Sequence, residues 1–189
     1  RDWEEVRAAL EVEDWMLMGH SWGGILMMGY WQKHPQAIDG MLFLNCTLSC
    51  GTSMEDSWLP TAIDILGDQT SPVAKDVTRP LKERLMAVFP HLNDDNRWRI
   101  FSPDRSAYEA LDSPDFHKDC ISHNGEHVLF MDEYWQDFRP LTSNVNVPVL
   151  FLFGTQDFSV GPEFYKGVHF PDAVVCGAEC GHMIFIEEP

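Results

Sequence analysis

The sequence predicts an α/β fold in which helices cover a parallel sheet. Helical patterns alternate with short apolar runs over residues 1–45, and the same alternation returns over residues 148–176. Continuous apolar runs between helices are typical of buried strands in a parallel sheet. The composition agrees, because 44% of the 189 residues are hydrophobic, well above the share typical of disordered chains. Disordered, collagen-like and coiled-coil classes are therefore excluded.

The first part of the chain predicts the order helix, strand, helix, strand. Residues 1–10 place apolar side chains at helical spacing, and residues 15–18 form a short, continuously apolar run. A glycine-rich interruption at 19–24 separates this run from a second helical pattern over 25–33, which a His-Pro pair ends. Residues 40–45 then form a second predicted strand.

The last part of the chain repeats this logic. Residues 148–154 predict a strand, 162–166 the start of a helix, and 173–176 a last strand. The chain begins inside its first helix and stops at 186–189, where a new helix would start. We therefore expect the interior piece of a longer chain, which needs a missing N-terminal segment or a partner chain beside its first strand.

Residues 47–147 form the middle of the chain and show no comparable pair of strands. They hold amphipathic pieces such as 78–89 and 108–111, and ten aromatic residues, more than a solvated linker would need. We expect a helical cap inserted into the core. The predicted divisions are 1–46 for the first part of the core, 47–147 for the cap and 148–189 for the second part of the core.

The charge of the chain limits its partners. With 13 Lys and Arg against 30 Asp and Glu, the net charge is −17, and no basic cluster is present. We therefore expect no nucleic-acid partner and no anionic membrane partner, and no apolar run is long enough to span a bilayer. Five cysteines are too few and too scattered for a disulfide framework, which favours reduced thiols and a cytoplasmic location.

One motif carries nucleophile chemistry. Gly19-His20-Ser21-Trp22-Gly23 matches the pattern G-x-S-x-G and lies between a predicted strand and a predicted helix. A sharp turn at that place exposes the serine hydroxyl and tolerates only small residues at the glycine positions. A serine hydroxyl needs a histidine to take its proton and a carboxylate to orient that histidine.

Asp157 and His182 are the candidates for those two roles. Asp157 follows the strand at 148–154, and His182 follows the strand at 173–176. Because the carboxyl ends of parallel strands share one edge of a sheet, we expect Ser21, Asp157 and His182 to converge there.

These residues resemble the α/β-hydrolase superfamily over nearly the whole chain. The Gly-His-Ser-Trp-Gly-Gly segment, the long helical cap and Gly-His-Met-x-Phe-Ile-Glu-Glu-Pro are similar to the proline iminopeptidase branch. The resemblance implies Ser21 as nucleophile, His182 as general acid and base, Asp157 as its orienting acid, and the backbone N–H of Trp22 as an oxyanion-hole donor. It implies no cofactor and no metal.

Two departures from the family pattern bear on catalysis and on substrate choice. The early strands and the loop that supplies the second oxyanion donor are absent from this sequence, and Phe158 follows Asp157 where iminopeptidases of this branch place a glutamate that binds the substrate amine. Glu126, Asp132 and Glu133 of the cap are alternative amine ligands, although solvated surface carboxylates are the favoured explanation for them.

The remaining histidines and cysteines have structural explanations. We interpret His20 and His34 as structural, because one lies beside the nucleophile and the other ends a helix. One histidine and cysteine cluster matches no standard zinc spacing, and four cysteines fit as buried small side chains. The cluster is His117, Cys120, His123 and His127, and the four cysteines are Cys46, Cys50, Cys176 and Cys180.

The sequence thus supports two functions from different classes. The first is a serine hydrolase that cleaves a small ester or amide, or a short peptide, through an acyl-enzyme on Ser21, as an aminopeptidase or carboxylesterase. A carbon–carbon bond hydrolase and a lactonase are variants of it. The second is a non-catalytic or incomplete α/β-hydrolase-fold chain that needs a partner segment to be active.

Overall fold

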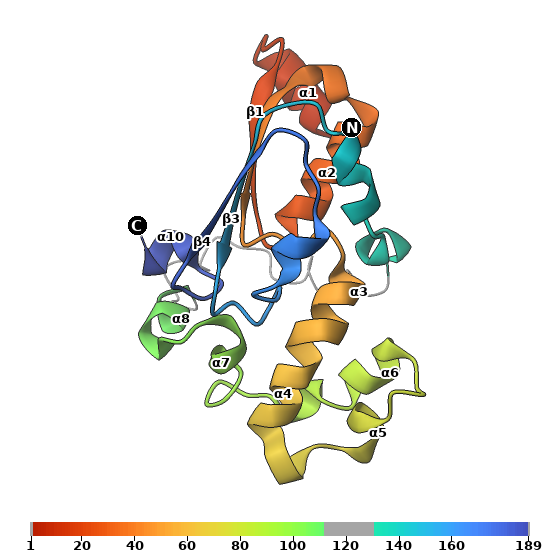
Figure 1. The fold of residues 1–189 in the computed structure, drawn as a ribbon, viewed down its shortest axis with the longest axis vertical. Coiled ribbons are helices and arrows are strands. Elements are labelled where there is room, and N and C mark those ends of the chain that lie inside the picture. Colours follow the sequence, from red (N-terminus) through yellow and green to blue (C-terminus); the bar gives the residue numbers. More distant parts are fainter. Residues whose placement is uncertain (1, 112–130, 189) are drawn as a thin grey trace.

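A single parallel sheet organises the fold (Figure 1). The computed structural model describes residues 2–111 and 131–188. The sheet has the order β1-β2-β3-β4, and each neighbouring pair is parallel. Its strands are β1 (Trp15–His20), β2 (Ile38–Leu44), β3 (Val149–Gly154) and β4 (Ala173–Ala178). The predicted α/β class with a parallel sheet is confirmed.

Helix α2 (Gly23–Lys33) packs on one face of this sheet and builds the main core. Met27 and Met28 of the helix are fully buried, as are Phe43 of β2 and Phe151 of β3, whose ring centroids are 5.6 Å apart. Helix α1 (Asp2–Ala9) packs beside it, with Trp3 and Tyr30 at 5.3 Å between ring centroids. The turn η1 (Pro35–Ala37) joins α2 to β2.

The opposite face of the sheet carries exposed apolar side chains. The register places Met18, Leu42, Leu150 and Val174 in one row across the four strands. The two ends of this row are open, since Met18 is 70% exposed and Val174 is 61% exposed. Within the described residues, β1 pairs with β2 alone, which leaves its other edge without a strand.

Helices and turns make up the described parts of the segment between β2 and β3. Three elements, α3, η2 and α4, run on without a break from Cys50 to Leu66, and the middle one is a π-helical turn. A second apolar cluster forms around them, with Trp58, Leu59 and Ile100 buried in it. The elements are α3 (Cys50–Ser53), η2 (Met54–Trp58), α4 (Leu59–Leu66), η3 (Gly67–Gln69), α5 (Pro72–Lys75), α6 (Leu81–Met86), η4 (Phe89–His91), α7 (Trp98–Phe101), α8 (Arg105–Leu111), η7 (Asp132–Trp135) and η8 (Arg139–Asn144).

Some predicted helices differ from the structure. The helix predicted over 78–89 is confined to α6, because Pro80 restricts the residue before it to extended conformations and so sets the N-terminus of the helix. The helix start predicted at 162–166 is only a 3₁₀ turn, η9 (Phe164–Gly167). The helix expected to begin near 186 begins earlier, as α10 (Ile184–Glu187), directly after the loop that carries His182.

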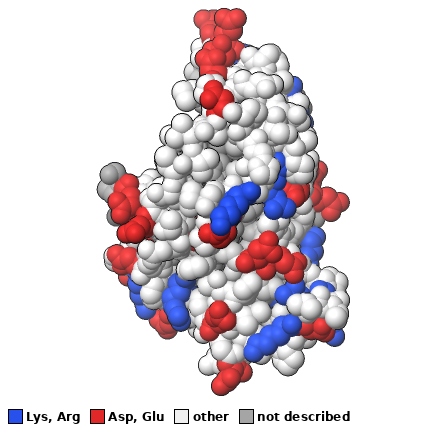
Figure 2. All heavy atoms as spheres, in the orientation of Figure 1, with Lys and Arg blue, Asp and Glu red and all other residues white. Residues whose placement is uncertain are grey.

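The surface reflects the acidic composition. Figure 2 shows Asp and Glu at the upper end of the molecule and scattered over the rest of this face, whereas Lys and Arg lie mostly over its lower half. Among the helices in the described ranges, none combines the length and the apolar character needed to cross a bilayer.

Candidate active site

Ser21 occupies the sharp turn between β1 and α2. Its φ of 57° lies in the left-handed region, which costs a non-glycine residue on the order of 1–3 kcal/mol. The backbone of β2 and the loop after it hold this conformation. The Ser21 N–H donates to the carbonyl of Leu44 at 3.2 Å, and the Ser21 carbonyl accepts from the N–H of Thr47 at 3.1 Å. Trp22 is the N-cap of α2, so its N–H has no acceptor within that helix.

The glycines around this turn differ in how closely they are packed. A Cβ on Gly19 would collide with Sδ of Met27, and a Cβ on Gly24 would lie 2.7 Å from the Thr47 carbonyl oxygen. Gly23 has no atom within 4 Å of its would-be Cβ. The expectation that both motif glycines need to be small is therefore wrong at Gly23. The second close approach is at Gly24, because the first turn of α2 packs against residues 46–48.

His182 and Asp157 meet at the same edge of the sheet. Asp157 lies three residues beyond β3 and His182 four residues beyond β4, and both are buried, at 2% and 3% exposure. Nδ1 of His182 donates to Oδ2 of Asp157 at 2.9 Å. In a neutral imidazole this leaves Nε2 unprotonated and able to accept a proton. The structure thus brings together the predicted acid and base.

Asn45 connects this pair to the end of β2. Its Nδ2 donates to Oδ2 of Asp157 and to the carbonyl of Gly181, both at 3.0 Å. Asn45 is 1% exposed and has a φ of 45°, a conformation that asparagine tolerates better than most residues. The other carboxylate oxygen, Oδ1, accepts from the N–H groups of Ser159 at 2.9 Å and Val160 at 3.1 Å. Asp157 therefore cannot rotate without losing hydrogen bonds on both oxygens.

Glu187 holds the loop that carries His182 from the other side. Its Oε2 accepts from the N–H of Gly181 at 2.8 Å, and its Oε1 accepts from the N–H of Met183 at 3.1 Å. These two amides flank His182 in the chain. The carboxylate of α10 therefore fixes the backbone on each side of the histidine.

His20 packs on His182 at a ring-centroid distance of 4.6 Å. Its Nε2 donates to the His182 carbonyl at 2.8 Å, and burial lowers the pKa of His20 to about 4. This contact agrees with a structural role for His20. Among the described residues, no hydrogen bond joins Ser21 Oγ to His182. Such contacts are often long without substrate and tighten when it binds.

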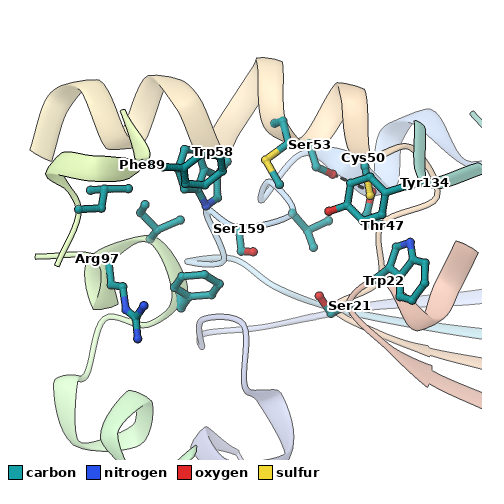
Figure 3. A pocket seen from close by; sticks show the side chains of 15 residues that line it. Ser21, Trp22, Thr47, Cys50, Ser53, Trp58, Phe89, Arg97, Tyr134 and Ser159 are labelled. Atoms are coloured by element: carbon teal, nitrogen blue, oxygen red, sulfur yellow. Dashed lines mark hydrogen bonds between the residues drawn. The ribbon is translucent and has the colours of Figure 1, made fainter. Parts of the chain in front are cut away.

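Ser21 opens into a pocket of about 440 Å³ beneath α3 and α4 (Figure 3). The lining is mostly apolar, with hydroxyl groups near Ser21. The lining side chains are Ser21, Trp22, Thr47, Cys50, Ser53, Met54, Trp58, Phe89, Leu92, Arg97, Ile100, Phe101, Tyr134, Ser159 and Val160. A cavity of this size can hold a small organic molecule.

Of the three predicted amine ligands, the two within the described residues do not line this pocket. Asp132 and Glu133 are exposed, while Tyr134 of the same turn is buried and lines the pocket. Phe158 lines a neighbouring cavity instead. Glu126 lies outside the described residues.

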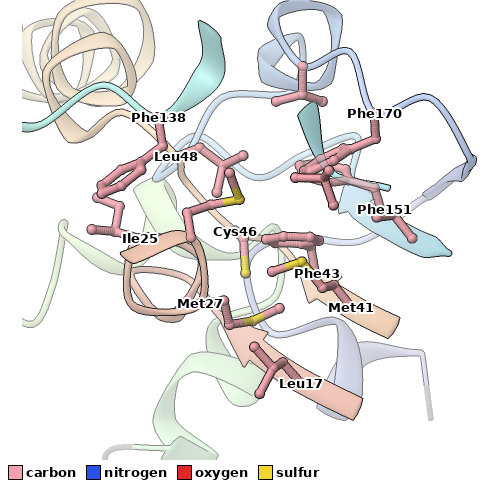
Figure 4. Packing of buried hydrophobic residues seen from close by; sticks show 14 of the residues in the cluster. Leu17, Ile25, Met27, Met41, Phe43, Cys46, Leu48, Phe138, Phe151 and Phe170 are labelled. Atoms are coloured by element: carbon pink, nitrogen blue, oxygen red, sulfur yellow. The ribbon is translucent and has the colours of Figure 1, made fainter. Parts of the chain in front are cut away.

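Three of the four cysteines in the described ranges are buried, and their thiols have raised pKa values. Cys46 is buried beside Met27 and Phe43 in the core (Figure 4), and burial raises the pKa of its thiol to about 12. Burial likewise raises the pKa of Cys50 and of Cys180 to about 11, whereas Cys176 is exposed. These values favour neutral thiols at pH 7.

The other predicted sites are placed as follows. His34 ends α2 and lies 3.9 Å from a Glu4 carboxylate oxygen, which agrees with a structural role. The cluster at 117–127 lies outside the described residues. No group of three or more His, Cys, Asp or Glu within the described ranges could hold a metal ion.

A comparison with known protein families identifies the family to which the chain belongs. A family model described as "Serine aminopeptidase, S33" matches residues 3–189. The chain belongs to this serine aminopeptidase family. It is a family of α/β-hydrolases, so the predicted superfamily is confirmed.

Individual relatives agree with the family match. The proline iminopeptidase of Neisseria meningitidis serogroup A is 23% identical over 205 residues, which cover 97% of this chain and 66% of that protein. The proline iminopeptidase of Mycobacterium smegmatis has a TM-score of 0.62 at 18% identity, over 100% of this chain and 65% of that one. An esterase from Exiguobacterium antarcticum has a TM-score of 0.64 at 17% identity, over 99% and 66%. The chain thus spans just under two thirds of the length of the curated relatives that it matches.

Sequence reasoning missed Asn45 and Glu187. Asn45 is the last residue of the strand predicted over 40–45, so the strand-end argument used for Asp157 could have singled it out. Glu187 belongs to the Gly-His-Met-x-Phe-Ile-Glu-Glu-Pro segment, but nothing in that pattern predicts that its carboxylate folds back onto the histidine loop.

Proposed function

We propose that this member of the serine aminopeptidase family is a serine hydrolase that cleaves an ester or a small amide through an acyl-enzyme on Ser21. One observation carries the proposal. The hydrogen-bonded pair of His182 and Asp157 lies at the same sheet edge as Ser21, whose strained turn opens into a pocket. The substrate is a small molecule or a short peptide. The proposed catalysis needs no cofactor, no nucleic acid and no membrane. We place the protein in the cytoplasm.

The mechanism follows from the roles these groups can take. Ser21 Oγ attacks the substrate carbonyl carbon while Nε2 of His182 takes the hydroxyl proton, so a C–O bond forms and the carbonyl oxygen becomes negative. The N–H of Trp22 donates to that oxyanion. The intermediate then expels the alcohol or amine, which leaves with the proton from His182. A water molecule then attacks the acyl-enzyme in the same way, with His182 as the base. The carboxylic acid is released as Ser21 regains its proton.

Asp157 supports both halves of this cycle. Because His182 Nδ1 donates to its carboxylate, the imidazole keeps the tautomer in which Nε2 is the base, and the positive charge that develops on the ring is stabilised. The donors on Asp157 from Asn45, Ser159 and Val160 fix the carboxylate itself.

The second candidate is a non-catalytic chain that needs a partner segment. The observation in its favour is that no hydrogen bond joins Ser21 Oγ and His182 within the described residues. A second oxyanion donor, which is worth about 10²–10³ in rate, would come from that segment.

Covalent labelling separates the two candidates. A fluorophosphonate probe should label Ser21 in the wild-type protein, as read by peptide mass spectrometry, and the Ser21→Ala variant should lose both the label and the hydrolysis of 4-nitrophenyl butyrate. Ser143→Ala is the matched control, since Ser143 is exposed on η8. An unlabelled Ser21, under conditions that label a control esterase, would contradict the catalytic proposal.

A further inference from the structure

The pocket beside Ser21 has two chemically different halves. Figure 3 shows Ser21, Thr47, Ser53 and Tyr134 gathered at one side, with the aromatic pair of Trp58 and Phe89 at the other. A reacting ester at Ser21 would therefore lie among hydroxyl groups, and the rest of the substrate would extend toward aromatic rings.

The far half is built to contact apolar groups. Trp58 and Phe89 lie 5.0 Å apart between ring centroids, and Trp58 is buried in the second apolar cluster. Met54, Leu92 and Ile100 also line the pocket. Removing apolar substrate surface from water here is favourable, by about a factor of four in affinity for each CH₂ group.

The described part of the pocket lining carries little charge. Of the described residues that line it, Arg97 is the only charged one, and its guanidinium lies 3.3 Å from a carboxylate oxygen of Asp94. In η7, Tyr134 lines the pocket with its hydroxyl-bearing side chain, whereas Asp132 and Glu133 are exposed. The side chain that follows Asp157, Phe158, lines the other cavity.

From this arrangement we infer the substrate class: an ester whose bound chain is apolar and uncharged, extends from Ser21 to the Trp58 and Phe89 rings, and carries no ammonium group. The inference rests on the proposed function and narrows it to an esterase. An ammonium group at the far end would lose its hydration, and among the described lining residues it would gain contacts with the aromatic faces of Trp58 and Phe89. The free energy gained from such contacts is smaller than the free energy of desolvation.

An isosteric pair of substrates tests this directly. 4-Nitrophenyl heptanoate and 4-nitrophenyl 6-aminohexanoate have the same leaving group and differ only in a terminal methyl or ammonium group. We expect kcat/KM to be at least about fourfold higher for the heptanoate, which is the value of the methyl group alone. A smaller or inverted ratio would overturn the inference, and so would a kcat/KM for L-proline 4-nitroanilide above that for the heptanoate.

A variant pair locates the discrimination. Phe89→Ala removes one ring of the far half. It should lower the ratio of kcat/KM for the heptanoate to kcat/KM for the 6-aminohexanoate at least about threefold relative to Met86→Ala. Met86 is 60% exposed on α6 and does not line the pocket. Equal ratios in the two variants would show that the chain binds elsewhere and would overturn the inference.

The labelling experiment distinguishes the two possible failures. Fluorophosphonate labelling of Ser21 together with a preference for the ammonium substrate refutes the substrate class and leaves the proposed function standing. Absence of both labelling and turnover refutes both.

Discussion

Replacing Glu187 by glutamine tests whether α10 holds the loop that carries His182. The two carboxylate oxygens accept from the N–H groups of Gly181 and Met183, at 2.8 and 3.1 Å. A glutamine side chain has the same shape but only one accepting oxygen, so one N–H would face an NH₂ group. The variant should lose about 1–3 kcal/mol of unfolding free energy, the typical cost of leaving a partly buried donor unpaired.

For a chain of 189 residues, this loss corresponds to a decrease in Tm of about 2–12 °C. Because the two amides flank His182, the loosened loop should also lower kcat/KM for an ester by about tenfold to a hundredfold. Differential scanning calorimetry and 4-nitrophenyl butyrate hydrolysis measure the two effects.

Glu188→Gln is the matched control for this prediction. Glu188 is the next residue, is exposed, and makes no side-chain hydrogen bond within the described residues. The control should leave Tm and kcat/KM close to those of the wild-type protein. If Glu187→Gln and Glu188→Gln unfold at the same temperature and hydrolyse the ester at the same rate, Glu187 does not position the histidine loop.

Two further predictions concern stability. Gly24→Ala should lower the unfolding free energy by about 1–3 kcal/mol in urea titrations, because its Cβ would overlap the Thr47 carbonyl oxygen. Gly23→Ala should have no such cost, since its Cβ would meet no atom within 4 Å. Equal losses in the two variants would refute the packing argument. His20 has a pKa near 4 when folded, against an ordinary 6.5, so the unfolded chain takes up its proton first and stability should fall as the pH falls from 6.5 toward 4, by up to about 3 kcal/mol. The His20→Gln variant should show a shallower loss over that window in urea titrations at several pH values, and identical slopes would contradict the assigned burial effect.

The alternation of elements and the place of the chemistry were accessible from the sequence. The apolar runs predict the four strands, and the residues that follow three of them predict where Ser21, Asp157 and His182 lie. These are local signals, because hydrophobic periodicity and strand-end position depend on neighbouring residues alone. The helix predicted over 78–89 was wrong in extent even at this level, since Pro80 acts on the residue before it.

The contacts that orient those residues were decided only by the tertiary structure. Asn45 and Asp157 are 112 positions apart, and they meet because β2 and β3 are neighbours in the sheet. The same holds for the pocket, whose aromatic half comes from helices that no strand pattern places over Ser21. The sequence by itself determines which segments form the strands, although β1 and β4 each extend two residues beyond their predicted ends. Which strands lie side by side, and therefore which side chains touch, depends on packing between distant segments, and here that packing directs Glu187 onto the histidine loop and Phe158 away from Ser21.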